Sequence, residues 1–267
     1  MKDINVTPEG SIYGTYLTDF GAWGIQTRNV TCFLLVGSKR ALLIDTAYGE
    51  GDLRALVESI TDLPLTVVNT HGHYDHTSGN AFFEEVWMGE GAAEIALGVE
   101  TRTKLPHPDY TIRTLKDGQE FDLGDRVVEA IAIGAHHASS FAFLDKENRT
   151  IYTGDELEAA QVLLNVRRDD LATKEIVKLH LANMRKLKER SHEFDRLVPA
   201  HNGGPLAKSY IDDYIDLSKA ILEGSIKPLE TVAGFGWPST IFGGDEKLVR
   251  YHLGKATFVC NRDQAVI

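Results

Sequence analysis

Short blocks of apolar residues alternate with polar and glycine-containing segments along the chain, and their spacing predicts strands and helices in turn. β-Branched and aromatic residues predict strands over 11–17 and 30–36. After a turn that begins at Gly37, the segment ALLIDTA, 41–47, predicts the returning strand of a hairpin. The segment LTVVN, 65–69, predicts a buried strand that ends just before His71.

Apolar residues spaced three and four positions apart predict the helices. The clearest helix covers 173–190, where Ile176, Val177, Met184 and Leu187 form an apolar stripe. Other predicted helices cover 51–60, 78–85, 91–98 and 206–222. Further strands are predicted at 86–90, within 117–134 around a turn at Gly124, in a hairpin of 140–145 and 149–155, at the start of 196–204, and at 257–260. This mixture of hairpins and strand–helix–strand units indicates a layered architecture of sheets and helices.

The chain shows no internal repeat, low-complexity tract or Pro/Ser-rich linker. We therefore predict a single domain over 1–267, with 206–267 as a C-terminal helix and tail packed on it. Cys32 and Cys260 lie in apolar, strand-like runs without a metal-ligand partner nearby in sequence. Both are predicted to be buried, reduced thiols.

Composition and charge narrow the classes of function. Of the 267 residues, 43% are hydrophobic and 25% charged, which is typical of a globular protein. The net charge of −11, without a clustered basic stripe, argues against a nucleic-acid partner. No apolar run is long enough to span a bilayer, and the start MKDINVTPEG lacks the apolar segment of a secretory signal. We therefore expect a cytoplasmic protein that acts on a small molecule without membrane association; a homo-oligomer is compatible with the sequence.

The segment with the strongest chemical signal follows the predicted strand 65–69. It contains three histidines and an aspartate within six residues: His71, His73, Asp75 and His76. An apolar core gains nothing from these side chains, and their unpaired burial would be costly. A loop at the end of a strand can aim several of them at one point, and imidazole and carboxylate groups suit zinc and similar divalent ions. The segment therefore predicts a metal site rather than a histidine-rich surface loop.

This segment, HGHYDH, resembles the H-x-H-x-D-H signature of the metallo-β-lactamase superfamily. Three later segments resemble the superfamily's other landmarks, in order: GAHHASSFAFLD with His136 or His137, YTGDEL with Asp155, and PAHNGG with His201. The resemblance covers about residues 30–205. It implies an α/β fold, the four-layer αββα sandwich, and a site for two metal ions.

The resemblance also implies a role for each matching residue. The first ion would be bound by His71, His73 and His136, and the second by Asp75, His76 and His201, with Asp155 bridging the two. A metal-bridging hydroxide would be the nucleophile, and Asp75 would also orient it, so Asp75 and Asp155 are the expected catalytic residues. Zinc is the favoured ion, with iron or manganese as alternatives.

Two nearby positions are less directly assigned. The spacing to Ser140 aligns His136 with the ligand position, so that His137 points elsewhere or lines the pocket. Asp45, in LIDT, matches a superfamily aspartate behind the site, where it would support the ligand loop or simply cap a strand end. The remaining histidines, His107, His180, His192 and His252, are predicted to have surface or capping roles.

The resemblance implies a hydrolase that cleaves an ester, lactone or thioester. The retained His76 and Asp155 differ from true β-lactamases with a cysteine in the second site and agree better with the glyoxalase II and lactonase branches. However, the tail lacks the basic glutathione-binding motif of glyoxalase II, and Glu158 stands where lactonases have tyrosine. A nuclease insert and the features of flavin-linked diiron relatives are missing. A mononuclear-iron persulfide dioxygenase, a β-lactam hydrolase and a non-catalytic metal scaffold remain as alternatives.

Two segments could form a wall for the substrate. FGAWG, 20–24, and GFGWP, 234–238, each place a tryptophan among glycines, which suits a mobile apolar cover or a packed loop anchor. Trp23, His137 and Trp237 are therefore the candidate substrate-binding residues.

Overall fold

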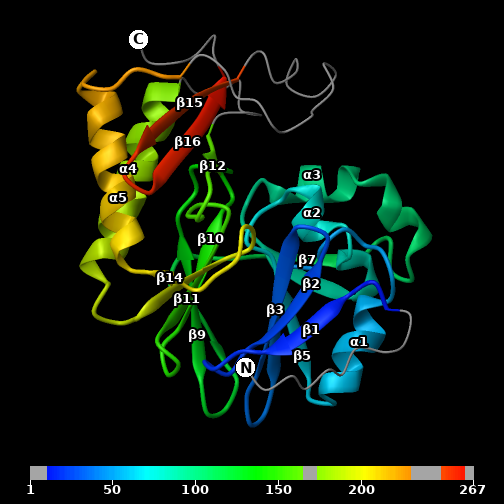
Figure 1. Ribbon diagram of the computed structural model, residues 1–267. Helices are drawn as coiled ribbons and strands as arrows, with labels where there is room; N and C mark the ends of the chain where they lie inside the picture. Colours follow the sequence, from blue (N-terminus) through cyan, green and yellow to red (C-terminus); the bar gives the residue numbers. More distant parts are fainter. Residues whose placement is uncertain (1–10, 165–172, 230–247, 262–267) are drawn as a thin grey trace.

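The computed structural model describes residues 11–164, 173–229 and 248–261 (Figure 1). Its first sheet has seven strands in the order β1-β2-β3-β4-β5-β6-β7. Neighbours from β1 to β4 are antiparallel, and neighbours from β4 to β7 are parallel. The seven strands are Gly14–Leu17, Trp23–Thr27, Val30–Val36, Ala41–Ile44, Leu65–Val68, Glu85–Met88 and Thr111–Thr114.

The second sheet has six strands in the order β14-β13-β11-β10-β9-β8, of which only the pair β11 and β13 is parallel. From β8 to β11 these strands are Gln119–Asp122, Val127–Ala132, Phe141–Asp145 and Thr150–Gly154, followed by β13, Arg196–Pro199, and β14, Leu206–Ala207. A third, small sheet joins β12, Val162–Leu163, to β16, Ala256–Asn261, and β15, Leu248–Leu253.

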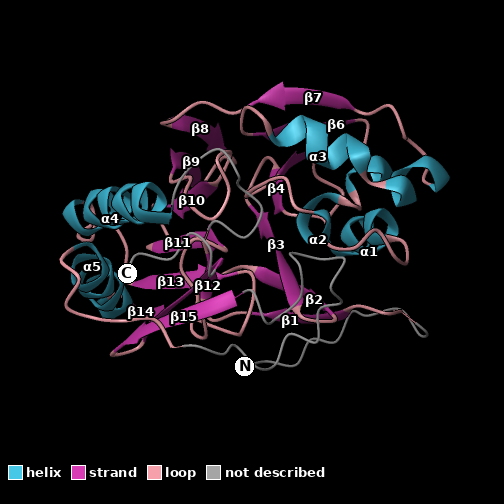
Figure 2. Cartoon of the chain, turned by 90° about the horizontal axis from the view of Figure 1, so that it is seen from above, coloured by secondary structure: helices cyan, strands magenta, loops and turns pink. Residues whose placement is uncertain are grey.

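Helices cover the outer faces of the two large sheets, which gives four layers (Figure 2). On the side of the first sheet lie α1, Leu53–Ile60, α2, Tyr74–Thr77, and α3, Ala92–Gly98, with the short 3₁₀ helices Asn80–Phe82 and Glu100–Lys104. On the side of the second sheet lie the paired helices α4, Thr173–Glu189, and α5, Ser209–Leu222. The predicted αββα sandwich is therefore confirmed.

Three apolar clusters hold these layers together, and the period of two along each strand explains them. In β3, Cys32 and Leu34 face the cluster under α1 and α3, whereas Phe33 and Leu35 face the cluster between the sheets. In β10, Phe143 faces the cluster between the sheets, whereas its neighbours face the cluster under α4 and α5. The strands β4, β10 and β11 are buried at every position, and β4 is apolar throughout, as expected of a strand covered on both faces.

The C-terminal part of the described chain belongs to the apolar cluster under α4 and α5. Residues of α5 and of the hairpin β15–β16, among them Tyr214, Tyr251 and Phe258, pack with α4 and the second sheet. The predicted single domain over 1–267 stays a prediction. Cys32 and Cys260 are buried and free, as predicted.

Two differences from the predicted elements lie in the first sheet and in the helical layer beside it. Residues 20–24 were expected to be a loop, but β2 begins at Trp23, and Gly24 lies within it. A Cβ atom at Gly24 would come within 2.3 Å of the Tyr16 ring, so the glycine is there because an aromatic side chain crosses the strand. Within 78–85, where a helix was expected, the structure has only the 3₁₀ helix Asn80–Phe82, and β6 begins at Glu85; the short helix α2 ends before this range, at Thr77.

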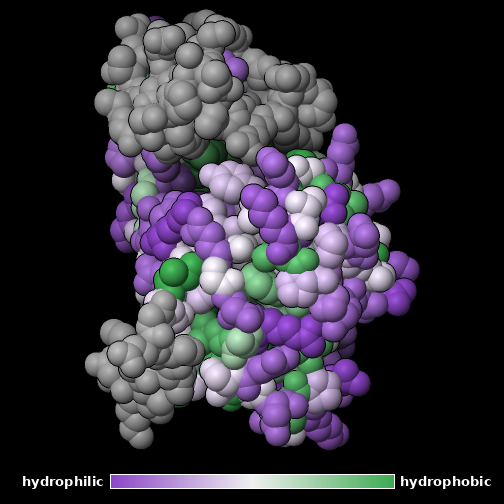
Figure 3. Space-filling view, turned by 90° about the vertical axis from the view of Figure 1, so that its right-hand side faces the viewer, coloured by the Kyte–Doolittle hydropathy of each residue, from purple (hydrophilic) through white to green (hydrophobic). Residues whose placement is uncertain are grey.

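Hydrophilic residues cover much of the face in Figure 3, with smaller hydrophobic patches among them. None of the helices in the described residues is long and apolar enough to cross a membrane.

Candidate metal centre

The predicted ligands come from four segments that follow strands of the two large sheets. His71 to His76 follow β5 of the first sheet, whereas the loops after β9, β11 and β13 of the second sheet carry His136, Asp155 and His201. The structure brings all seven candidate ligands together. They form overlapping groups whose potential ligand atoms lie within 4.8 Å of one another.

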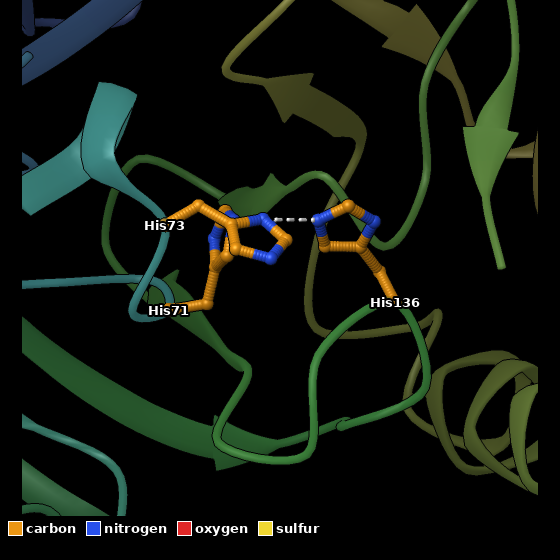
Figure 4. A group of neighbouring side chains, drawn as sticks. All are labelled: His71, His73 and His136. Carbon is orange, nitrogen blue, oxygen red and sulfur yellow. Dashed lines mark hydrogen bonds between the residues drawn. The ribbon is translucent and has the colours of Figure 1, made fainter. Parts of the chain in front are cut away.

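The first group consists of His71, His73 and His136, whose rings turn toward one another (Figure 4). Nδ1 of His73 lies 3.0 Å from Nε2 of His71 and 3.0 Å from Nε2 of His136. Two nitrogens bound to the same zinc ion at tetrahedral angles would lie about 3.3 Å apart, so this group has nearly the spacing of a shared ion.

The second group consists of Asp75, His76 and His201. Nε2 of His76 lies 3.3 Å from Nε2 of His201, and Oδ2 of Asp75 lies 3.4 Å from Nε2 of His201. Asp75 and His76 are adjacent residues of the short helix α2, whereas His201 follows β13 of the second sheet.

Asp155 lies between the two groups and presents a different oxygen to each. Its Oδ2 is 3.6 Å from Nε2 of His136, and its Oδ1 is 3.3 Å from Nε2 of His76 and 3.5 Å from Nε2 of His201. Oδ1 is buried and has no hydrogen-bond partner in the described chain. A buried carboxylate oxygen without such a partner is costly, and a cation at this point would stabilise it.

The outer ring nitrogens of three histidines are held by hydrogen bonds. Nδ1 of His76 donates to Asp45 at 2.9 Å, and Nδ1 of His136 donates to the carbonyl oxygen of Leu163 at 2.8 Å. Nδ1 of His201 donates to the carbonyl oxygen of Asn29 at 2.6 Å. In a neutral ring the proton stays on the outer nitrogen, so that each Nε2 would direct a lone pair at the centre of the site once a cation binds there.

Asp45 supports the ligand loop rather than only ending a strand. Its Oδ1 accepts a hydrogen bond from the backbone N–H of Thr70 at 2.7 Å, and its Oδ2 accepts from the Thr70 hydroxyl at 2.8 Å. The residue is 1% exposed and has a positive φ of 65°. Its one carboxylate thus fixes both the start of the loop and the ring of His76.

The electrostatics of the metal-free site differ between the two groups. Burial, and then the neighbouring His76, hold the pKa of His71 well below its usual value. Burial and the neighbouring His136 lower the pKa of His73 to about 2. In the second group, opposite charges outweigh burial. Asp155 and Asp75 raise the pKa of His201 to about 10. His76 and His201 lower the pKa of Asp75 to about 2. The first group thus offers neutral nitrogens, and the second holds protons that a cation would displace.

The three candidate substrate-binding residues differ in their position relative to the metal ligands. His137 is beside the ligands, with its ring 5.1 Å from the ring of His73, but its Nδ1 contacts the hydroxyl of Ser139 at 2.7 Å. Trp23 pairs with Leu34 at one end of the β2–β3 hairpin, whereas Asn29, which contacts His201, lies at the other. The two ends of such a strand are about 14 Å apart, so the structure does not bring Trp23 to the ligands. Trp237 lies outside the described residues.

Of the other histidines, His180 differs from its expected surface role. It lies in α4 with 0% exposure, and its Nε2 donates to the carbonyl oxygen of Glu156 at 2.8 Å. Burial lowers its pKa to about 4 and thus favours the neutral ring. The position of His180 in a helix did not indicate that its ring packs against the turn that follows Asp155.

A family model, that of the metallo-beta-lactamase superfamily, matches residues 25–225. The chain belongs to this superfamily. A metallo-beta-lactamase from Pontibacter korlensis superposes with a TM-score of 0.59 at 19% identity, covering 78% of this chain and 99% of that one. A beta-lactamase domain protein from Burkholderia ambifaria superposes with a TM-score of 0.62 at 17% identity, covering 93% and 95%. At these identities the likeness shows the fold.

Curated relatives with sequence similarity include two thioesterases and a hydroxyacylglutathione hydrolase. The acyl-coenzyme A thioesterase MBLAC2 of Gallus gallus is 29% identical over 154 residues, which cover 46% of this chain and 56% of the relative. A hydroxyacylglutathione hydrolase of Brucella anthropi is 36% identical over 93 residues, covering 35% and 33%. An atrochrysone carboxyl ACP thioesterase of Aspergillus fumigatus is 27% identical over 135 residues, covering 49% and 41%. The chain thus spans about half the length of the curated relatives it matches, or less.

Proposed function

We propose that this chain is a metal-dependent hydrolase that cleaves an ester or thioester bond, with an acyl thioester as the preferred substrate class. The observation that carries the proposal is the position of Asp155, whose two carboxylate oxygens face two separate groups of ligand atoms. One carboxylate that faces two such groups is suited to bridging two cations.

The residues present fit two divalent ions. Nitrogen and carboxylate donors at this spacing, with the outer histidine nitrogens held by Asp45 and by backbone carbonyls, are typical of zinc sites. Zinc is therefore the favoured ion, with iron or manganese as alternatives. His71, His73 and His136 would hold the first ion, Asp75, His76 and His201 the second, and Asp155 both.

Bound ions would supply an electrophile for the substrate carbonyl and would lower the pKa of an attacking water. The chain's own contribution is orientation. Asp75 would bind the second ion as a carboxylate, and its other oxygen can accept a hydrogen bond from that water. The histidine rings are fixed by their outer hydrogen bonds, so little reorganisation is needed when charge develops on the carbonyl oxygen.

The leaving group decides between ester-type and amide substrates. A thiolate or alkoxide can depart as an anion, whereas an amide nitrogen must usually be protonated first. Among the described residues at the ligands, His137 is a candidate donor, but its Nδ1 already contacts Ser139. The names of the curated relatives, acyl-coenzyme A thioesterase and hydroxyacylglutathione hydrolase, also favour a thioester.

A substrate panel tests this proposal. We expect an acyl thioester to be the best substrate of the metal-loaded protein, ahead of aryl esters and lactones, with kcat/KM at least ~10-fold above any β-lactam, or about 1.4 kcal/mol in barrier. Initial rates should be compared for acyl-coenzyme A and acylglutathione thioesters, aryl esters, γ- and δ-lactones, β-lactams and phosphodiesters. A panel led by β-lactams or phosphodiesters would contradict the ester and thioester assignment. Oxygen consumption on a persulfide, with one bound iron, would instead favour the dioxygenase.

A further inference from the structure

One turn of the chain touches both halves of the candidate metal centre. It is the turn 154–158, which follows β11 and contains Asp155. In the second sheet, β11 lies between β13, which leads to His201, and β10, which follows the loop carrying His136. The turn therefore lies between the two loops that present these histidines, and two further carboxylates within it, Glu156 and Glu158, are almost completely buried, at 1% and 5% exposure.

Glu156 reaches the loop of the first group. Its Oε1 accepts a hydrogen bond from the backbone N–H of Ala135 at 2.8 Å and another from the backbone N–H of His137 at 3.3 Å. These two residues flank His136 on either side. A carboxyl group that accepts from both N–H groups fixes the backbone on which the His136 ring is carried, and an ionised carboxylate forms stronger bonds of this kind than a neutral one.

Glu158 reaches the loop of the second group. Its Oε2 accepts a hydrogen bond from the side-chain amide of Asn202 at 2.6 Å. Asn202 directly follows His201 and has a positive φ of 61°, so its backbone forms the bend by which the chain leaves the histidine. The carboxylate thus holds the His201 loop from the side of Asp155.

The turn itself is held by residues outside it, so it can act as a fixed support. His180 of α4 donates to the carbonyl oxygen of Glu156 at 2.8 Å, and Tyr214 of α5 donates to that of Glu158 at 3.0 Å. The hydroxyl of Thr153 donates to the carbonyl oxygen of Leu157 at 3.0 Å. The backbone of the turn is therefore anchored to both outer helices.

We propose that Glu156 and Glu158 are positioning residues with divided roles: Glu156 orients His136 for the first metal ion, and Glu158 orients His201 for the second. The inference rests on the proposed function, because it takes His136 and His201 to be metal ligands. Both carboxylates act through the loops they hold, not on the substrate.

Stepwise metal affinities of the full chain test this division. Titration of the metal-free protein with Co²⁺ against a chromophoric chelator gives two affinities, and His136→Ala and His201→Ala identify which belongs to which group. We expect Glu156→Gln to weaken the His136 site about 10-fold and Glu158→Gln the His201 site about 10-fold, since changes around metal ligands cost about 10–100-fold. In each variant the other site should stay within about 3-fold of the wild type. Glutamine keeps an acceptor oxygen and nearly the same shape, so these variants should fold.

Two further variants, Glu156→Leu and Asn202→Gly, test the same two contacts. Glu156→Leu removes the acceptor and should weaken the His136 site about 100-fold, and Asn202→Gly, which tolerates the positive φ, should reproduce the selectivity of Glu158→Gln. Equal weakening of both sites in Glu156→Gln and Glu158→Gln, or unchanged affinities in both, would overturn the divided roles while the proposed function stands. If His136→Ala and His201→Ala leave metal binding unchanged, the proposed function falls as well.

Discussion

Replacing Asp155 with asparagine is expected to lower kcat/KM at least about 10³-fold, or about 4 kcal/mol in barrier, and to reduce the bound metal from two ions toward one. The two oxygens of Asp155 lie between two groups of histidine nitrogens, 3.3 Å from Nε2 of His76 and 3.6 Å from Nε2 of His136. Asparagine keeps the shape but loses the charge and replaces one oxygen by an N–H donor, which cannot bind a cation.

The matched control for this substitution is Asp195→Asn, which makes the same chemical change at an exposed ion pair with Arg149. This variant should keep both ions and full activity, because exposed ion pairs contribute little to stability. Kinetics on the best substrate and elemental analysis of the same preparations provide the measurements. Retention of both ions and near-normal activity in Asp155→Asn would show that Asp155 does not bridge.

Replacing His136 with alanine is expected to lower metal affinity by at least about 100-fold, whereas His137→Ala should change it less than about 3-fold. Nε2 of His136 lies 3.0 Å from Nδ1 of His73 and 3.6 Å from Asp155, so its removal deletes a ligand. The Nδ1 of His137 instead contacts the hydroxyl of Ser139. Because the two histidines are adjacent and equally buried at 8% exposure, each controls for general effects of the loss of an imidazole.

Chelator-competition titrations of both variants give the affinities. The reverse order, with His137→Ala losing metal and His136→Ala retaining it, would mean that the assignment of the third histidine is shifted by one position.

The ligand residues could be proposed from the sequence because they are dense and carry strong chemical constraints. Three imidazoles and a carboxylate between His71 and His76 have few roles other than metal binding, and the later landmarks resemble a known order. The groups that orient them were harder to find. His136 and His201 are held by the backbone carbonyl oxygens of Leu163 and Asn29. Because every residue has such an oxygen, the residue type does not indicate this contact.

The sequence also did not predict two features that depend on contacts with other segments, a glycine within β2 and a buried histidine in α4. Gly24 is the second residue of β2, where the ring of Tyr16 lies across the strand, and with Gly21 it made this segment resemble a glycine-rich loop. His180 looked like a polar residue on a helix surface, although it is buried against Tyr214 and Phe258 and donates to Glu156. In both cases the deciding contact comes from a distant segment or another strand, which single-sequence patterns do not contain.

The metal content of the full chain, purified without chelators, decides whether Asp155 joins two metal sites. Elemental analysis together with protein quantification by amino-acid analysis should find two divalent ions per chain, zinc foremost, bound by the two groups that Asp155 joins. A stoichiometry of one ion per chain that does not rise when zinc, iron or manganese is supplied would contradict the account.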